Sequence, residues 1–367
     1  MSTEHPPTTR PTDPLRLRLR DPGELVAAVP HLLGFRPVDS LVLVAVHGPG
    51  DAAERSSTRD PARSRRLGVV ARVDLPAPDD LAAVVDGCAA RVAATAPDEV
   101  IAIVVGGAGS TDPPRRDVAD AARGAFAGHG VEVPTRLWVP RIAGGAPWCC
   151  YPPCDCRGTV GPTDDSPLAA AAAWLGQVTY GSRAELEASL APGPPLPRLA
   201  ALIRAELEAA AVDRELGGPA AARRDLGAVT AARDEVASGR VLTDTEIARV
   251  AVALGDPAVR DVAIGWALDP DEALAAAAEQ LWTLLVRALP APEVAEPAVL
   301  LACAQLVRGG SALVGVALER ALRADPAHRL AGLVGALLAS GAGPDAVRSI
   351  VRDASAEAAH RLEGRAG

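Results

Sequence analysis

The sequence contains no lysine and no asparagine, and only 2% of its 367 residues are aromatic. The absence of lysine excludes three enzyme classes: P-loop nucleoside triphosphatases, protein kinases, and pyridoxal-phosphate enzymes that form a Schiff base. The absence of asparagine also excludes catalytic triads that depend on this residue. All 37 strongly basic side chains are therefore arginines, a bias that is typical of a very GC-rich coding sequence.

Long apolar runs are also missing. The longest, "SLVLVAV" at 40–46 and "VIAIVV" at 100–105, have the length of a strand, far below the roughly 20 residues of a membrane-spanning helix. The polar, proline-rich start of the chain has no apolar core of a signal peptide. We therefore expect a cytoplasmic protein that makes no membrane contact, in a compartment where persistent disulfides are uncommon.

The net charge is −9, and the isoelectric point is about 5.3. An acidic chain has no general attraction for phosphate backbones, so nucleic acid is not expected as a partner. Five arginines lie in the loop 48–66, where Asp51, Glu54 and Asp60 are interleaved with them. This loop could be a solvated surface segment or could bind an acidic partner, and the sequence leaves both open, as it does the oligomeric state.

The first half of the chain alternates strand and helix patterns. Strand patterns occupy 15–19, 40–46, 67–76, 99–105 and 131–139, and helical patterns lie between them. Two of the strands, 40–46 and 67–76, are expected to form a hairpin whose tip is the arginine-bearing loop. The alternation predicts an α/β domain with a mixed, largely parallel sheet.

The second half reads as helical almost without interruption. Capping boxes precede apolar runs at 182–185 and 243–246, and the segment 317–341 resembles the helical hairpin of a tetratricopeptide repeat. The sequence predicts four segments: a disordered tail at 1–14, an α/β domain with the cysteine loop at 15–192, a helical linker segment at 193–240, and an all-helical domain at 241–367.

Four of the six cysteines lie within eight positions, in "PWCCYPPCDC" at 147–156. Thiolates are ligands that zinc prefers, so Cys149, Cys150, Cys154 and Cys156 could hold this metal as a cofactor, with a further ligand from elsewhere. A disulfide from Cys149 or Cys150 to Cys154 is a second interpretation, and a loop without chemistry is the third. Cys88 and Cys303 lie on apolar helix faces and are expected in the core.

A weaker candidate site combines the turn after the first helix with the aromatic residues of the cysteine loop. "EVIAIVVGGAGS" at 99–110 ends a strand in a glycine-rich turn but lacks the G-x-G-x-x-G spacing of a phosphate-binding loop. Among the six histidines, only His31 is a candidate for a functional test, and a capping or packing role competes with catalysis. The candidate ligand-binding residues are His31, Gly34, Phe35, Asp39, Ser40, Trp148 and Tyr151.

Several segments together resemble an actinobacterial family known as domain of unknown function 4192. The resemblance rests on "LVAAVPHLLGFRPVDSLVLVAV" at 25–46, the tryptophan and cysteine loop followed by Gly158, "VLTDTEIARVAVAL" at 241–254 and "ALERALRADPAHRLAGLVGALLASG" at 317–341. The phrase "LLGFRPVDS" at 32–40 is the most specific part. The resemblance implies family membership without an assigned activity, and the cysteine loop departs from the family's pattern because Asp155 separates Cys154 from Cys156.

The motifs G-x-S-x-G and H-E-x-x-H are absent, so the sequence contains no complete catalytic constellation. Our leading hypothesis is a non-enzymatic, regulatory protein that binds a small molecule or another protein. One alternative is an enzyme with a site near the Gly34–Ser40 turn and the cysteine loop. The other alternative is a structural module that a metal or a disulfide stabilises.

Overall fold

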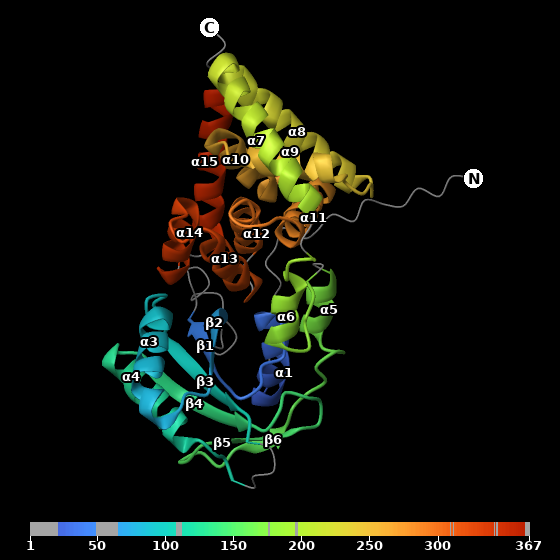
Figure 1. Ribbon diagram of the computed structural model, residues 1–367. Coiled ribbons are helices and arrows are strands. Elements are labelled where there is room, and N and C mark those ends of the chain that lie inside the picture. Colours follow the sequence, from blue (N-terminus) through green and yellow to red (C-terminus); the bar gives the residue numbers. More distant parts are fainter. Residues whose placement is uncertain are drawn as a thin grey trace, which may run out of the picture.

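The computed structural model describes residues 21–48, 65–107, 112–174, 177–194, 197–308, 310, 312–340, 342 and 344–363. The predicted tail at 1–14, the predicted strand at 15–19 and most of the loop at 48–66 lie outside these residues. In the described part, a six-stranded sheet with flanking helices is followed by a largely helical region (Figure 1).

The sheet has the strand order β2-β1-β3-β4-β5-β6. Only β3 and β4 run parallel, and every other neighbouring pair is antiparallel. The strands are β1 (Ser40–His47), β2 (Arg66–Asp74), β3 (Glu99–Val105), β4 (Glu132–Val139), β5 (Pro147–Cys150) and β6 (Arg157–Thr159).

The prediction of a largely parallel sheet was therefore wrong, although the mixed character is confirmed. The predicted hairpin of β1 and β2 is present, but β3 pairs with β1 instead of continuing beyond β2. Because β1 lies between β2 and β3, the crossover between these two strands creates no parallel neighbours. Two short strands, β5 and β6, then add further antiparallel pairs at the other edge.

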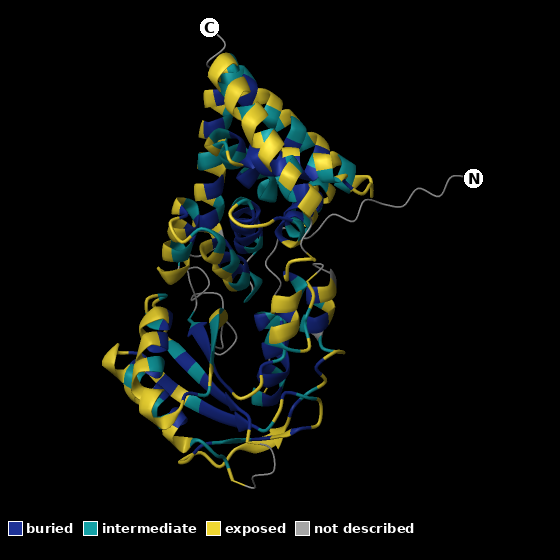
Figure 2. Cartoon of the chain, in the orientation of Figure 1, coloured by how far each residue is buried: buried dark blue, intermediate teal, exposed yellow. Residues whose placement is uncertain are grey.

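Helices cover both faces of the sheet, as Figures 1 and 2 show. Successive residues of a strand point to opposite faces. In β1, Leu41 and Leu43 pack against one helical layer, whereas Val42 and Val44 pack against the other. The first layer is formed by α3 (Leu81–Ala93) and α4 (Arg116–Gly128), and the second includes α1 (Pro22–Leu33) and Leu186 of α6 (Arg183–Ser189).

The helical region has its own apolar core. Its elements are α7 (Pro197–Gly217), α8 (Pro219–Ala237), α9 (Asp244–Leu254), α10 (Pro257–Ile264), the 3-10 turn η3 (Gly265–Leu268), α11 (Glu272–Ala288), α12 (Ala295–Val307), α13 (Ala312–Ala324), α14 (Arg329–Ala339) and α15 (Pro344–Glu363). Leu199 and Ile203 of α7 and Val229 of α8 bury their side chains in this core together with α9 to α15. The segment predicted as a linker therefore packs on the later helices, and the division into separate domains stays a prediction, as does the tetratricopeptide-like packing.

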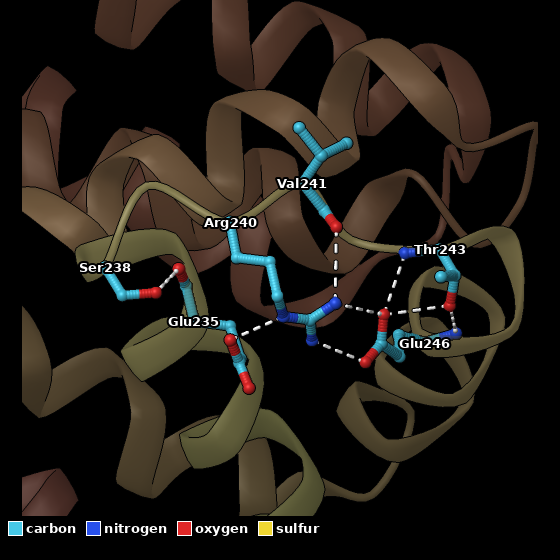
Figure 3. Close-up of polar contacts among 6 residues, drawn as sticks. All are labelled: Glu235, Ser238, Arg240, Val241, Thr243 and Glu246. Atoms are coloured by element: carbon cyan, nitrogen blue, oxygen red, sulfur yellow. Dashed lines mark hydrogen bonds and ion pairs between the residues drawn. The ribbon is translucent and has the colours of Figure 1, made fainter.

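Local polar contacts fix where the helices begin. Thr243 accepts a hydrogen bond from the backbone N–H of Glu246, and the Glu246 carboxylate accepts from the Thr243 N–H at 2.8 Å, which completes the predicted capping box. Arg240 joins this cap to α8, because it binds both Glu235 and Glu246 (Figure 3). These contacts, with Arg240 first, hold the pKa of Glu246 down at about 2.

The sheet region and the helical region meet at α6 and α13. Arg183 lies 3.6 Å from Glu319, and Leu313 and Val316 of α13 pack against the apolar layer on the α1 side of the sheet. The short helix α5 (Pro167–Trp174) precedes α6 and lies near α1. No described helix is both long enough and apolar enough to cross a membrane.

Candidate functional site

The candidate site is the hairpin formed by β5, the connecting residues 151–156 and β6. Trp148 and Cys150 face the α1 side of the sheet, where Trp148 is buried. Cys149 and Tyr151 face the opposite side and pack on the layer of α3 and α4. The strand therefore divides the four neighbouring residues into two pairs, and it separates the two adjacent cysteines.

The start of the connecting loop is held firmly by β4. Arg136 is buried, and its guanidinium donates to the carbonyl oxygen of Pro152 at 2.7 Å and pairs with Asp120 of α4. The Tyr151 N–H donates to the Arg136 carbonyl at 2.9 Å, and the Tyr151 hydroxyl donates to the carbonyl of Pro114. These contacts fix the loop immediately after Cys150.

The loop brings three thiols together. The Sγ atoms of Cys150, Cys154 and Cys156 all lie within 4.8 Å of one another. The Cys150 N–H donates to the Cys156 carbonyl at 2.8 Å, and the Cys156 N–H lies 3.4 Å from the Cys154 Sγ. Cys150 is half-buried, whereas Cys154 and Cys156 are exposed. The group therefore lies at the surface and is open to an ion from solvent.

The spacing of these thiols fits a tetrahedral metal ion. Zn–S bonds of about 2.3 Å place two sulfur ligands about 3.8 Å apart, so closing the group needs shifts of about 1 Å or less. Soft thiolates are the donors that zinc and other soft ions prefer. The donor type and the spacing therefore both fit a bound zinc ion.

The three thiols differ in the direction in which the protein shifts their pKa values. Burial first, and then the neighbouring Cys154 thiol, raise the pKa of Cys150 to about 12. A hydrogen bond from Cys156 lowers the pKa of Cys154, and the same interaction raises the pKa of Cys156. Since a metal binds thiolates, loading this group releases protons.

The remaining cysteines lie in apolar layers of the fold. Burial raises the pKa of Cys149, whose side chain contacts the α3 and α4 layer. Cys88 belongs to the same layer, and Cys303 is buried in the helical core, as predicted. Burial also raises the pKa of Cys303, to about 12. These three thiols therefore lie apart from the group of Cys150, Cys154 and Cys156.

In the turn before β1, the Ser40 hydroxyl forms its hydrogen bonds within the protein. Gly34 ends α1 with φ of 79°, a left-handed conformation that favours glycine, and Phe35 is buried in the α1 layer. Ser40 is fully buried, and its hydroxyl donates to the Val38 carbonyl at 2.6 Å. Arg72 donates its Nε–H to Ser40 Oγ at 2.7 Å and lies over the Phe35 ring.

His31 joins α1 to two distant loops. Its Nε2 lies 2.7 Å from the Thr163 carbonyl oxygen, and its Nδ1 lies 2.9 Å from the Thr179 hydroxyl. A carbonyl oxygen can only accept, so Nε2 donates to Thr163. Asp39, in contrast, is exposed and adopts a positive φ of 42°. His31 therefore uses both ring nitrogens in contacts that join α1 to these loops, and its role stays a prediction.

Phe35 and Trp148 belong to the same apolar layer on the α1 side, but the sheet separates Ser40 from the cysteine loop. Ser40 begins β1, Trp148 lies on β5, and β3 and β4 run between these strands. Three strand spacings of about 4.8 Å correspond to about 14 Å. The described contacts therefore join the Gly34–Ser40 turn to Arg72 and to the α1 layer, and join the cysteine loop to β4 and α4.

One further site has no signal in the sequence. A cavity of about 300 Å³ lies where the segment after α5 meets α11, α12 and α15. Its lining comes from segments that are far apart along the chain, so no local motif could reveal it. The lining residues are Gln177, Ala267, Leu268, Asp269, Glu272, Ala275, Val307, Arg308 and Arg348.

The chain matches a protein-family model. The model described as "Domain of unknown function (DUF4192)" matches residues 22–345, which confirms the resemblance that the sequence motifs indicated. Comparisons with curated proteins and with solved structures find no match to this chain.

Proposed function

The chain belongs to the DUF4192 family, and we propose that it is a non-enzymatic, metal-dependent regulatory protein whose zinc ion is held by Cys150, Cys154 and Cys156. The observation that carries this proposal is the group of three Sγ atoms within 4.8 Å of one another. Bound zinc would cross-link the loop through thiolates and would carry no redox chemistry of its own.

The surroundings of the three thiols support a binding role. The start of the loop is held by Arg136 and Tyr151, so Cys150 is already in place before an ion arrives. Cys154 and Cys156 lie on the exposed part of the loop and can close on the ion. Such partial preorganisation lowers the ordering cost of binding.

The experiment is metal analysis of protein purified without chelator, together with titration of free thiols in denaturant. We expect about one equivalent of zinc and no oxidised cysteine. The variant Cys154→Ser/Cys156→Ser should lose the metal, and Cys303→Ser, which removes a thiol buried in the helical core, serves as the control.

Two results separate the alternatives. Two missing thiols without metal would favour the disulfide interpretation, with Cys150 and Cys154 as the pair. Less than a tenth of an equivalent of metal, with all six thiols titrating, would reject both the metal and the disulfide.

The cavity near Gln177 supports a second candidate function, the binding of a small molecule. Its volume of about 300 Å³ lies at the lower end of the range for ligand pockets. Arg308, Arg348 and Asp269 line it, but Arg308 already pairs with Glu279, Arg348 with Asp345 and Asp269 with Arg233, so a ligand would have to compete with these ion pairs. Thermal-shift measurements with free amino acids, comparing wild type with Arg308→Ala, test this role.

The hypothesis of a ligand site at the Gly34–Ser40 turn stays a prediction. Asp39 is the exposed polar residue of that turn, so Asp39→Ala is the variant that tests it. A ligand that binds there would lose affinity in this variant without a loss of bound zinc.

A further inference from the structure

We infer that the metal at Cys150, Cys154 and Cys156 has three protein thiolates and an open fourth position, which an external thiolate or imidazole can occupy. This inference rests on the proposed function and extends it from holding a metal to exchanging one of its ligands. It concerns the fourth ligand, for which Cys149 is the obvious candidate in the sequence.

Cys149 is directed away from the three thiols. It follows Trp148 and precedes Cys150 on β5, and side chains of successive strand residues point to opposite faces. Cys150 and Trp148 pack on the α1 side, whereas Cys149 packs with the layer of α3 and α4. Bringing the Cys149 Sγ to the metal would require β5 to break its pairing with Trp138 on β4.

The open position faces solvent. Cys154 and Cys156, which provide two of the three sulfur atoms, are exposed. Among the described residues, no fourth histidine, cysteine, aspartate or glutamate joins the group of three. A tetrahedral ion held by these thiolates from the loop side therefore directs its remaining position outward.

Three protein ligands and one open position distinguish reactive zinc sites from closed structural ones, which hold four. At this surface position, the open site suits an incoming soft donor from a partner protein or from a small thiol. An incoming thiol would release its proton to water as its sulfur replaces the bound water on zinc. Neither the sulfur nor the zinc changes its oxidation state in this ligand exchange.

The test uses Co²⁺ as a spectroscopic substitute for zinc in the full-length protein. Addition of 2-mercaptoethanol, and separately of imidazole, should shift the cobalt absorption bands in a saturable manner with one donor per metal. X-ray absorption of the zinc form should give three sulfur neighbours without added thiol and four with it.

The matched control is Cys149→Ser, which should bind the metal with unchanged stoichiometry and give the same spectral shift as wild type. Four sulfur neighbours in untreated wild type, or a nitrogen neighbour from the chain itself, would overturn the open position while leaving zinc binding intact. Cobalt bands that do not respond to either donor would overturn it as well. Absence of bound metal in wild type would overturn both proposals, so the two failures can be told apart.

Discussion

The turn before β1 and the hairpin of β5 and β6 both contain predicted site residues, but the polar side chains of the two regions make different contacts. In the turn, Ser40 and Arg72 bind each other and nearby carbonyl groups. In the hairpin, three thiols converge at the surface. Convergence of donor atoms toward an open point is a stronger sign of binding than an unusual residue pattern.

The largest effect should come from removing two of the converging thiols. Cys154→Ser/Cys156→Ser should weaken zinc affinity by roughly 100-fold or more. Mutating a residue that only hydrogen-bonds to a metal ligand already costs about 10- to 100-fold in affinity, and this variant removes two ligands themselves. Competition with a chromophoric chelator measures the change. Cys149→Ser should stay within a few fold of wild type, and an equal loss in this variant would reassign the ligands.

The next largest effect is expected on stability, from a substitution in the turn before β1. Ser40→Ala leaves the buried Nε–H of Arg72 without its acceptor, so we expect a loss of about 1–3 kcal/mol in the free energy of unfolding. Urea denaturation measures this loss, and bound zinc should stay at its wild-type level. Ser238→Ala, which removes an exposed hydroxyl, is the control and should change stability by less than about 0.5 kcal/mol. Equal stability of both variants would contradict the structural role of Ser40.

A smaller effect is expected at the base of the hairpin. Tyr151→Phe removes the hydroxyl that donates to the Pro114 carbonyl but keeps the buried ring. We expect a loss of about 1 kcal/mol of stability from this hydrogen bond. Chemical denaturation checks the value, and zinc analysis should give unchanged stoichiometry. A variant as stable as wild type would show that this hydroxyl contributes no net stabilisation.

The smallest effect concerns the capping box of α9. The pKa of Glu246 is about 2 in the folded protein, against an ordinary value of 4.5, so its contribution is present above about pH 4.5 and is lost as the pH falls toward 2. Thermal unfolding of Glu246→Gln and wild type should differ by a few degrees at most at pH 7, and the difference should disappear near pH 2. High salt should reduce it, because Arg240 and Glu246 are exposed. A difference that is the same at both pH values would contradict the assigned cause.

Local features of the fold could be predicted, whereas pairing between distant strands could not. The capping box at Thr243 and the Ser182 cap of α6 follow from residues within one turn of helix, and the sequence predicted both. The direction of the sheet depends on β3 pairing with β1, a choice that hydrophobic alternation does not encode. The largely parallel prediction failed for this reason.

Prediction of the candidate site from the sequence was limited in the same way. The sequence identified four clustered cysteines, but the separation of Cys149 from the other three depends on recognising 147–150 as a strand. Pro147 and the prolines after Tyr151 conceal that strand in the sequence. The cavity near Gln177 depends on tertiary packing alone and had no local signal.

The buried Arg136 has a consequence for communication within the molecule. Its guanidinium donates to the Pro152 carbonyl of the cysteine loop and pairs with Asp120 in the N-terminal half of α4. A rearrangement of the loop on binding or losing the proposed ion would therefore pull on α4, one of the two helices that cover this face of the sheet. Through this single side chain, binding of the proposed ion would be coupled mechanically to the layer of α3 and α4.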